Sequence, residues 1–245
     1  MINKKHYTHQ IKYFDKEFSG MQTYKLAAWQ KSYITRIKKY MLDKEFKKKT
    51  LLDVASGSGY IAIEMAKMGM NVIATDLSPQ SLKNLNNFKK QFKLRNLTLI
   101  ECKAEKIPLK SKSVDYLVAN AILEHIPAES STIREWKRLV KPGGKMFITV
   151  PLQFRYIWPF LWIINYIHDK RIGHLRRYDV SILRKRFKLK VLNFFYTGHL
   201  VKIVGILKKI IYKTDKFDNY YEKMDDKKSQ KRYGANNVSV IFIQE

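Results

Sequence analysis

The chain has 245 residues, a mass of 29.1 kDa and a formal net charge of +27. Hydrophobic residues make up 45% and aromatic residues 13%, which excludes a disordered or collagen-like chain. The single cysteine, Cys102, excludes a disulfide framework, a multi-cysteine zinc site and a cysteine-ligated iron–sulfur cluster, and it fits a reducing compartment.

The sequence predicts neither a signal peptide nor a transmembrane helix. The first ten residues lack an apolar core, and the longest uncharged run, residues 156–167, is interrupted by Pro159 and is shorter than the roughly 20 residues that a bilayer requires. The positive charge favours an acidic partner, either nucleic acid, an anionic membrane surface or a phosphorylated substrate, or else only maintains solubility. We expect a cytoplasmic protein, with peripheral attachment to the inner face of the membrane as an option.

From Lys49 to Val150, short apolar runs alternate with helical stretches. This order is typical of parallel βαβ units, so we predict an α/β fold whose sheet is covered by helices on both faces. Ser78 and Pro79 are a helix-start signal, and Asp179 is predicted to cap a later helix. The expected strands cover residues 50–56, 71–76, 97–104, 113–121, 145–151, 189–198 and 236–244.

The chain is predicted to divide into a helical cap, residues 1–48, and a main domain, residues 49–245. The main domain carries two insertions, at residues 152–178 and 199–234. Residues 213–232 are charged and poor in aliphatic side chains, which predicts a mobile loop.

A glycine turn from Asp53 to Gly59 joins the first strand to its helix. Glycines here allow a ligand to approach the backbone at the electropositive start of the helix. A carboxylate at Asp53 would repel a pyrophosphate but attract a cation, which favours S-adenosylmethionine over a dinucleotide. Asp76, at the end of the second strand, is placed to accept hydrogen bonds from ribose hydroxyls, or else only caps the next helix.

The chain resembles class I S-adenosylmethionine-dependent methyltransferases of the type 11-like group, in particular the set for small molecules and lipids that includes quinone-biosynthesis enzymes. The resemblance is carried by the successive motifs LLDVASGSGYIA, ATDLSP, CKAEKIPL, SVDYLVANAILEHIP and RLVKPGGKMFITVP, with a looser match at GHLRRYD. It implies a Rossmann-like, mostly parallel seven-stranded sheet with an antiparallel last strand, and S-adenosylmethionine as cofactor.

The resemblance also implies where the cofactor binds. The residues placed around it are Asp53, Ala55, Gly57, Gly59, Asp76, Leu77, Ala104, Glu105, Asn120, Ala121 and Ile122. The glycine turn and the fourth strand surround the methionine end, Asp76 holds the ribose, Leu77 covers the adenine, and Ala104 and Glu105 lie at its edge. Ala55 replaces a glycine of the family, which requires ordinary backbone torsions. Lys103 stands where the family often has an acidic residue.

His125 follows the strand that faces the methyl group, and it is the candidate base for a hydroxyl acceptor, or else only shapes the pocket. The Asn/Asp-Pro-Pro-aromatic run of amino-methylating nucleic-acid enzymes is missing from this segment, and no metal is expected to be required. His174, Arg176 and Tyr178 are the candidate substrate-binding residues, because their alternate spacing near the pocket rim suits an acidic or phosphorylated group.

Both insertions are rich in residues that suit an apolar partner. Residues 200–213 predict a helix with an apolar face and a lysine face, which either lies on an anionic membrane or docks on the protein itself. Tryptophan and tyrosine in residues 154–167 favour the membrane or a wall of an apolar pocket. The predicted function is methyl transfer to an oxygen of a small apolar or lipid-linked acceptor. The alternatives are an RNA-directed methyltransferase and a non-catalytic cofactor-binding scaffold at a membrane.

Overall fold

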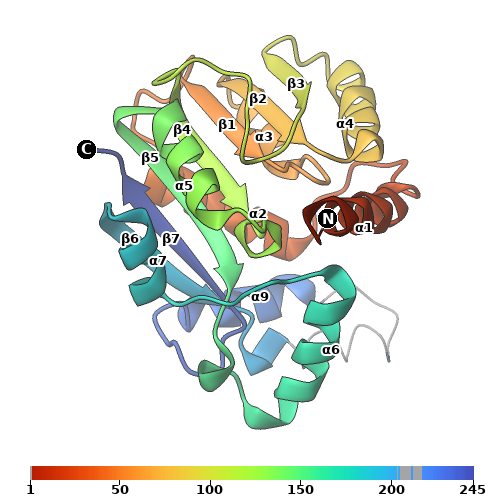
Figure 1. The fold of residues 1–245 in the computed structure, drawn as a ribbon, viewed down its shortest axis with the longest axis vertical. Helices are drawn as coiled ribbons and strands as arrows, with labels where there is room; N and C mark the ends of the chain where they lie inside the picture. Colours follow the sequence, from red (N-terminus) through yellow and green to blue (C-terminus); the bar gives the residue numbers. More distant parts are fainter. Residues whose placement is uncertain (1, 203, 205–210, 212–216) are drawn as a thin grey trace.

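A computed structural model describes residues 2–202, 204, 211 and 217–245 of the chain. Its centre is one seven-stranded sheet with the order β3-β2-β1-β4-β5-β7-β6, in which β7 runs antiparallel to both of its neighbours (Figure 1). The predicted α/β fold with an antiparallel last strand is therefore confirmed. The strands are β1 (Thr50–Val54), β2 (Asn71–Asp76), β3 (Leu97–Glu101), β4 (Val114–Asn120), β5 (Val140–Pro151), β6 (Lys190–Thr197) and β7 (Asn237–Ile243).

Helices lie on both faces of this sheet (Figure 1). The helices of the N-terminal half are α1 (Ile2–Phe18), α2 (Ala28–Arg36), the π-helix η1 (Ile37–Met41), α3 (Tyr60–Lys67), α4 (Pro79–Gln91) and the short η2 (Leu123–His125). Those that follow are α5 (Glu129–Leu139), η3 (Phe154–Tyr156), η4 (Pro159–Leu161), α6 (Trp162–Ile172), α7 (Val180–Phe187) and α9 (Asp218–Lys227).

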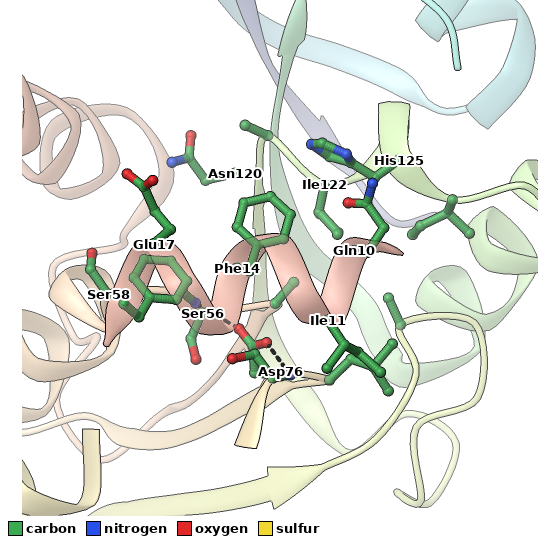
Figure 2. A pocket seen from close by; sticks show the side chains of 18 of the residues that line it. Gln10, Ile11, Phe14, Glu17, Ser56, Ser58, Asp76, Asn120, Ile122 and His125 are labelled. Atoms are coloured by element: carbon green, nitrogen blue, oxygen red, sulfur yellow. Dashed lines mark hydrogen bonds between the residues drawn. The ribbon is translucent and has the colours of Figure 1, made fainter. Parts of the chain in front are cut away.

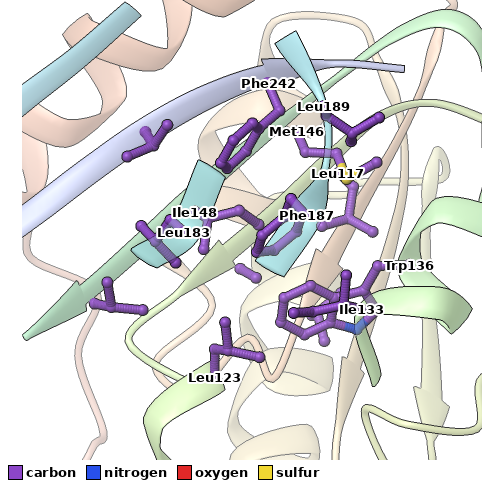
Figure 3. Packing of buried hydrophobic residues seen from close by; sticks show 14 of the residues in the cluster. Leu117, Leu123, Ile133, Trp136, Met146, Ile148, Leu183, Phe187, Leu189 and Phe242 are labelled. Carbon is purple, nitrogen blue, oxygen red and sulfur yellow. The ribbon is translucent and has the colours of Figure 1, made fainter. Parts of the chain in front are cut away.

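The two faces of the sheet form two separate hydrophobic cores. Successive side chains of a strand point to opposite faces, so Leu51 joins one core and Leu52 the other. The first core packs α2, η1, α3 and α4 against the sheet. In the second, Trp136 of α5 and Phe187 of α7 pack over β4 and β5, with Phe187 stacked on Phe242 of β7 (Figure 3).

Both predicted helix caps are present. The Ser78 side chain accepts a hydrogen bond from the Ser81 N–H at the start of α4, and Asp179 accepts one from the Ile182 N–H at the start of α7. Side-chain oxygens at these positions satisfy backbone donors that the first helical turn leaves free.

Residues 218–227 differ from the prediction, because they form helix α9 rather than a mobile loop. The buried Asp225 accepts hydrogen bonds from the backbone N–H groups of Gly198 and His199 and also pairs with the His199 ring. Asp226 pairs with Arg36 of α2. Charge composition alone suggested solvation here, whereas these acids have specific buried partners.

The predicted helix over residues 200–213 falls mostly outside the described residues. Among the described residues, no helix combines the length and apolar character needed to cross a bilayer.

Candidate active site

A cavity of about 510 Å³ lies at the carboxyl ends of β1, β2 and β4, where the strand order reverses direction. Open α/β sheets bind their ligands at this position. Helix α1 crosses over the cavity (Figure 2). The predicted site residues that line it are Ala55, Gly57, Asp76, Leu77, Ala104, Glu105, Asn120, Ala121, Ile122 and His125.

Asp76 joins the glycine turn to the end of β2. One carboxylate oxygen accepts a hydrogen bond from the Gly57 N–H at 2.7 Å, and the other accepts one from the Ser78 N–H at 2.8 Å. Burial raises the pKa of Asp76, while these backbone donors act in the opposite direction. Each carboxylate oxygen has a second acceptor site, so Asp76 retains capacity for ribose hydroxyls. Its side chain does not cap α4, because Ser78 does.

Asp53 and Gly59 lie behind the cavity wall rather than in it. The Asp53 carboxylate accepts a hydrogen bond from the Ala62 N–H at 3.2 Å, and burial raises its pKa to about 8. This arrangement does not support the expectation that Asp53 itself faces the cofactor as a charge. Gly59 precedes α3 at φ +71°, and a Cβ there would lie 2.4 Å from a methyl carbon of Leu85, so its role is in packing.

The backbone of Ala55 is left-handed, with φ +53°, which differs from the ordinary torsions that its substitution for glycine required. This conformation costs an L-residue about 1–2 kcal/mol, which glycine avoids. Ala121, which lies across the cavity after β4, has φ +55°. The turn after β1 and the turn after β4 both present backbone to the cavity, and each contains an alanine in the strained left-handed conformation.

We expect Ala55→Gly to raise the free energy of unfolding by about 0.5–1 kcal/mol, because relief of the strain exceeds the entropy that glycine adds to the unfolded chain. The matched control is Ala62→Gly within α3, where glycine is expected to cost about 1 kcal/mol. Denaturant unfolding of both variants measures the difference. Loss of stability in Ala55→Gly would contradict the left-handed assignment.

Helix α1 supplies one side of the cavity, and sequence reasoning placed none of its residues there. Its contributions share a helical stripe at Tyr7, Ile11, Phe14 and Phe18, a spacing that could have revealed the face. Phe18 packs on the glycine turn, 3.1 Å from where a Gly57 Cβ would lie.

Hydrogen bonds fix α1 in place at both ends of the cavity. Tyr7 donates to Glu105, and Asp15 accepts from the hydroxyl of Ser78. Asn84 of α4 donates to the Phe18 carbonyl. The helix is therefore anchored directly to the loops that the family resemblance assigns to the cofactor.

The charge of the cavity is opposite to that of the protein as a whole. In the part of the chain that the structure describes, the charged residues that line it are the acids Glu17, Asp76 and Glu105 and the cation Lys103. Figure 2 shows Glu17 projecting from α1 towards Asn120. An acidic, partly enclosed cavity favours a cationic ligand and disfavours a diphosphate.

Three buried polar atoms in the cavity wall have no hydrogen-bond partner among the described residues. They are Ser56 Oγ, Glu105 Oε2 and Asn120 Oδ1. Asn120 is oriented by donating its amide N–H to the hydroxyl of Tyr60 at 3.0 Å, which leaves its carbonyl oxygen unused. Unpaired buried acceptors are costly, and a ligand with amino and hydroxyl donors would satisfy them.

His125 lies at the end of the cavity away from the glycine turn (Figure 2). Burial, together with neighbouring His174 and His6, lowers its pKa to about 3, so the imidazole is neutral. Its ring lies 4.7 Å from that of His174 and 5.5 Å from that of Phe14, measured between centroids. The adjacent Glu124 is fully buried, and burial raises its pKa to about 8.

The three candidate substrate-binding residues lie apart from the cavity lining. The His174 ring contacts the His125 ring on the side away from the cavity lining, and its Nδ1 is 2.7 Å from Oδ1 of Asp169. Arg176 donates to the carbonyls of Ile126 and Pro127, and Tyr178 is buried in the core beside β5. Arg176 and Tyr178 therefore stabilise the fold at the point where the chain returns to the sheet. There, the Tyr178 N–H donates a hydrogen bond to the carbonyl of Pro151.

Together, the sheet order, the glycine turn and the acidic cavity at the switch point define a Rossmann-like α/β domain built to hold a nucleoside cofactor. Residues 52–148 match the family model of the methyltransferase domain Methyltransf_11. This segment of the chain is therefore similar to the methyltransferase domain that the model describes.

Several curated proteins are similar to the same part of the chain. The ubiquinone biosynthesis O-methyltransferase of Xanthomonas oryzae pv. oryzae is 34% identical over 103 residues, which is 40% of this chain and 41% of that protein. The protein of the same name from Aliivibrio fischeri strain ES114 is 35% identical over 104 residues, 41% of this chain and 43% of the relative. The chain thus spans about two fifths of the length of these relatives.

Solved structures share the fold over nearly the whole chain. A geranyl diphosphate C-methyltransferase from Streptomyces coelicolor has a TM-score of 0.70 at 12% identity and covers 98% of each chain. A phosphoethanolamine N-methyltransferase from Haemonchus contortus has a TM-score of 0.66 at 15% identity, over 94% of this chain and 60% of that one. These similarities establish the fold and not the acceptor.

Proposed function

We propose that the protein transfers the methyl group of S-adenosylmethionine to an oxygen of a small apolar or lipid-linked acceptor. The observation that carries the proposal is the acidic cavity at the switch point of a protein with net charge +27. Such a cavity suits a nucleoside that carries an ammonium and a sulfonium rather than phosphates.

The cavity residues fit this cofactor. Asp76 would hold the ribose, Leu77 would cover the adenine, and the unpaired oxygens of Glu105 and Asn120 would accept hydrogen bonds from the ligand's amino groups. The cofactor supplies an electrophilic methyl group on a positively charged sulfur. The protein's task is to hold acceptor and cofactor together while excluding water, because positioning can supply much of the rate.

A large part of the remaining cavity wall is apolar, which supports an apolar acceptor. Ile11 and Phe14 of α1 line the cavity together with Ile122 and Ile126, and the Trp29 ring contacts that of Tyr60. His125 lies beside this apolar region, and we propose that its neutral imidazole accepts a hydrogen bond from the acceptor's hydroxyl and takes the proton late in methyl transfer, when the oxygen has become acidic. The relatives named as ubiquinone biosynthesis O-methyltransferases support oxygen as the methylated atom.

The direct test incubates the purified protein with methyl-labelled cofactor and fractionated cell extract. Label in a lipid or small-molecule fraction supports the proposal, whereas label in RNA would support the RNA-directed alternative. Calorimetry with S-adenosylmethionine and with a nicotinamide dinucleotide tests the cofactor independently. Normal cofactor binding without transfer to any fraction would favour the non-catalytic scaffold.

A second proposal concerns peripheral membrane association, because α6 and the turn before it expose a large apolar surface. Ile163 is 73% exposed, Ile164 65%, Ile167 60% and Phe160 62%. Soluble proteins rarely leave so many neighbouring apolar side chains in water, and Lys170 and the positive net charge suit an anionic surface.

We expect the protein to float with anionic liposomes and the double variant Ile163→Glu/Ile167→Glu not to do so. Two carboxylates placed in the contact face oppose both apolar burial and the negative surface potential. Leu192→Glu, at an exposed apolar position on β6, is the matched control and should float normally. A parent protein that stays at the bottom of the gradient would reject membrane association.

A further inference from the structure

Glu124, His125 and His174 converge beside the acceptor end of the cavity, and neither Glu124 nor His174 lines it. Glu124 and His125 belong to η2, directly after β4, whereas His174 comes from the return of the 152–178 insertion. One potential ligand atom from each residue lies within 4.8 Å of the others. Glu124 Oε1 and His174 Nε2 are 3.6 Å apart.

The cluster contains polar atoms for which the described residues provide no hydrogen bond. Both carboxylate oxygens of Glu124 are buried and unpaired, as is Nδ1 of His125. Glu124 has no exposed surface and His125 is only 4% exposed. A fully enclosed carboxyl group whose oxygens lack hydrogen bonds, beside two imidazoles, is an arrangement that folding disfavours unless a ligand satisfies it.

His174 is already oriented as a ligand would be. Its Nδ1 lies 2.7 Å from Asp169 Oδ1, and Asp169 is held in turn by two hydrogen bonds from the guanidinium of Arg177. This contact orients the ring so that Nδ1 faces the Asp169 carboxylate and Nε2 faces Glu124. Histidines that bind metals usually donate their other ring N–H to a carboxylate in this way.

We propose that Glu124, His125 and His174 bind a divalent transition-metal ion of the zinc class. Two imidazoles and one carboxylate are a donor set that zinc accepts with a fourth position open, and imidazole ligands disfavour magnesium. Because His125 also lines the cavity, a bound ion would lie beside the acceptor end, where it would act as a Lewis acid on an oxygen of the acceptor. That role for the ion rests on the proposed function, whereas the binding site does not.

The test uses the full chain, stripped with a chelator and then titrated calorimetrically with Zn²⁺. One ion per chain is expected, and Co²⁺ should give the visible absorption bands of a tetrahedral site. Glu124→Gln and His174→Gln should lose this binding, and Asp169→Asn should weaken it by about 10–100-fold. His9→Gln, which changes an exposed histidine outside the cluster, should bind like the parent protein.

Circular dichroism confirms that each variant is folded, and both substitutions to glutamine keep a similar side-chain volume. The proposal is overturned if the folded parent binds neither Zn²⁺ nor Co²⁺, if it binds only Mg²⁺, or if Glu124→Gln and His174→Gln bind Zn²⁺ normally. Calorimetry with S-adenosylmethionine on the same samples separates the two proposals. Zinc binding without cofactor binding would reject only the proposed function, and the reverse would reject only the metal site.

Discussion

Replacing Asp76 with alanine is expected to weaken S-adenosylmethionine binding by about 1–3 kcal/mol, or roughly 5–150-fold in the dissociation constant. The carboxylate is the cavity's predicted acceptor for the ribose hydroxyls. It also holds the Gly57 N–H, so its loss releases the turn that would carry the methionine end. Asp76→Asn keeps one carbonyl acceptor, and we expect it to lose less affinity than alanine.

Calorimetry measures this effect, and a remote aspartate provides the control. Asp179→Ala removes a helix cap on α7 and should lower the free energy of unfolding by about 1 kcal/mol without changing cofactor affinity. Comparing the two variants separates a local loss of binding from general destabilisation. If Asp76→Ala binds S-adenosylmethionine as tightly as the parent, the proposed cofactor orientation is wrong.

The positions of the strands along the chain and the edge of the sheet that holds the cavity could be predicted because they depend on local, periodic signals. Alternating apolar runs located the strands, and Ser78 with Pro79 located the start of α4. Parallel connection then brings the ends of β1, β2 and β4 to one edge. Ten of the predicted site residues line one cavity for this reason.

The predictions that the structure did not follow concern the direction of side chains and long-range contacts. Asp53 is in the predicted place in the chain, but its carboxylate turns towards the α3 backbone instead of the cavity. Tyr178 was predicted to lie at the rim of the cavity, but its ring is buried in the hydrophobic core. The alternation of apolar and polar residues along a strand indicates which side chains share a face of the sheet. It does not indicate which nearby backbone donors a polar side chain will bind.

The acidic lining of the cavity depends on a contact that no local pattern encodes. Glu17 and Tyr7 reach the cavity only because α1 folds over the glycine turn and binds Ser78 through Asp15. The selection of a cation, which the sequence assigned to Asp53, is therefore better explained by Glu17, Asp76 and Glu105 acting together. A cationic ligand is still favoured, but by these three acids of the cavity lining rather than by Asp53.

Replacing His125 with glutamine is expected to lower turnover by about 10²–10³-fold while leaving S-adenosylmethionine affinity nearly unchanged, which is the scale of a lost proton-transfer group. The imidazole lines the acceptor end of the cavity, far from Asp76 and the glycine turn (Figure 2). Initial rates with the labelled acceptor fraction and calorimetry with the cofactor measure the two quantities separately. His9→Gln is the matched control and should keep full activity.

The same variant distinguishes two ways in which His125 can act. If it removes the acceptor's proton directly, chelator treatment of the parent protein leaves turnover unchanged. If it acts as a ligand to an ion shared with Glu124 and His174, chelation lowers turnover to the level of His125→Gln, and Zn²⁺ restores the parent but not the variant. Full activity in His125→Gln would exclude both routes, and methyl transfer would then depend on positioning alone.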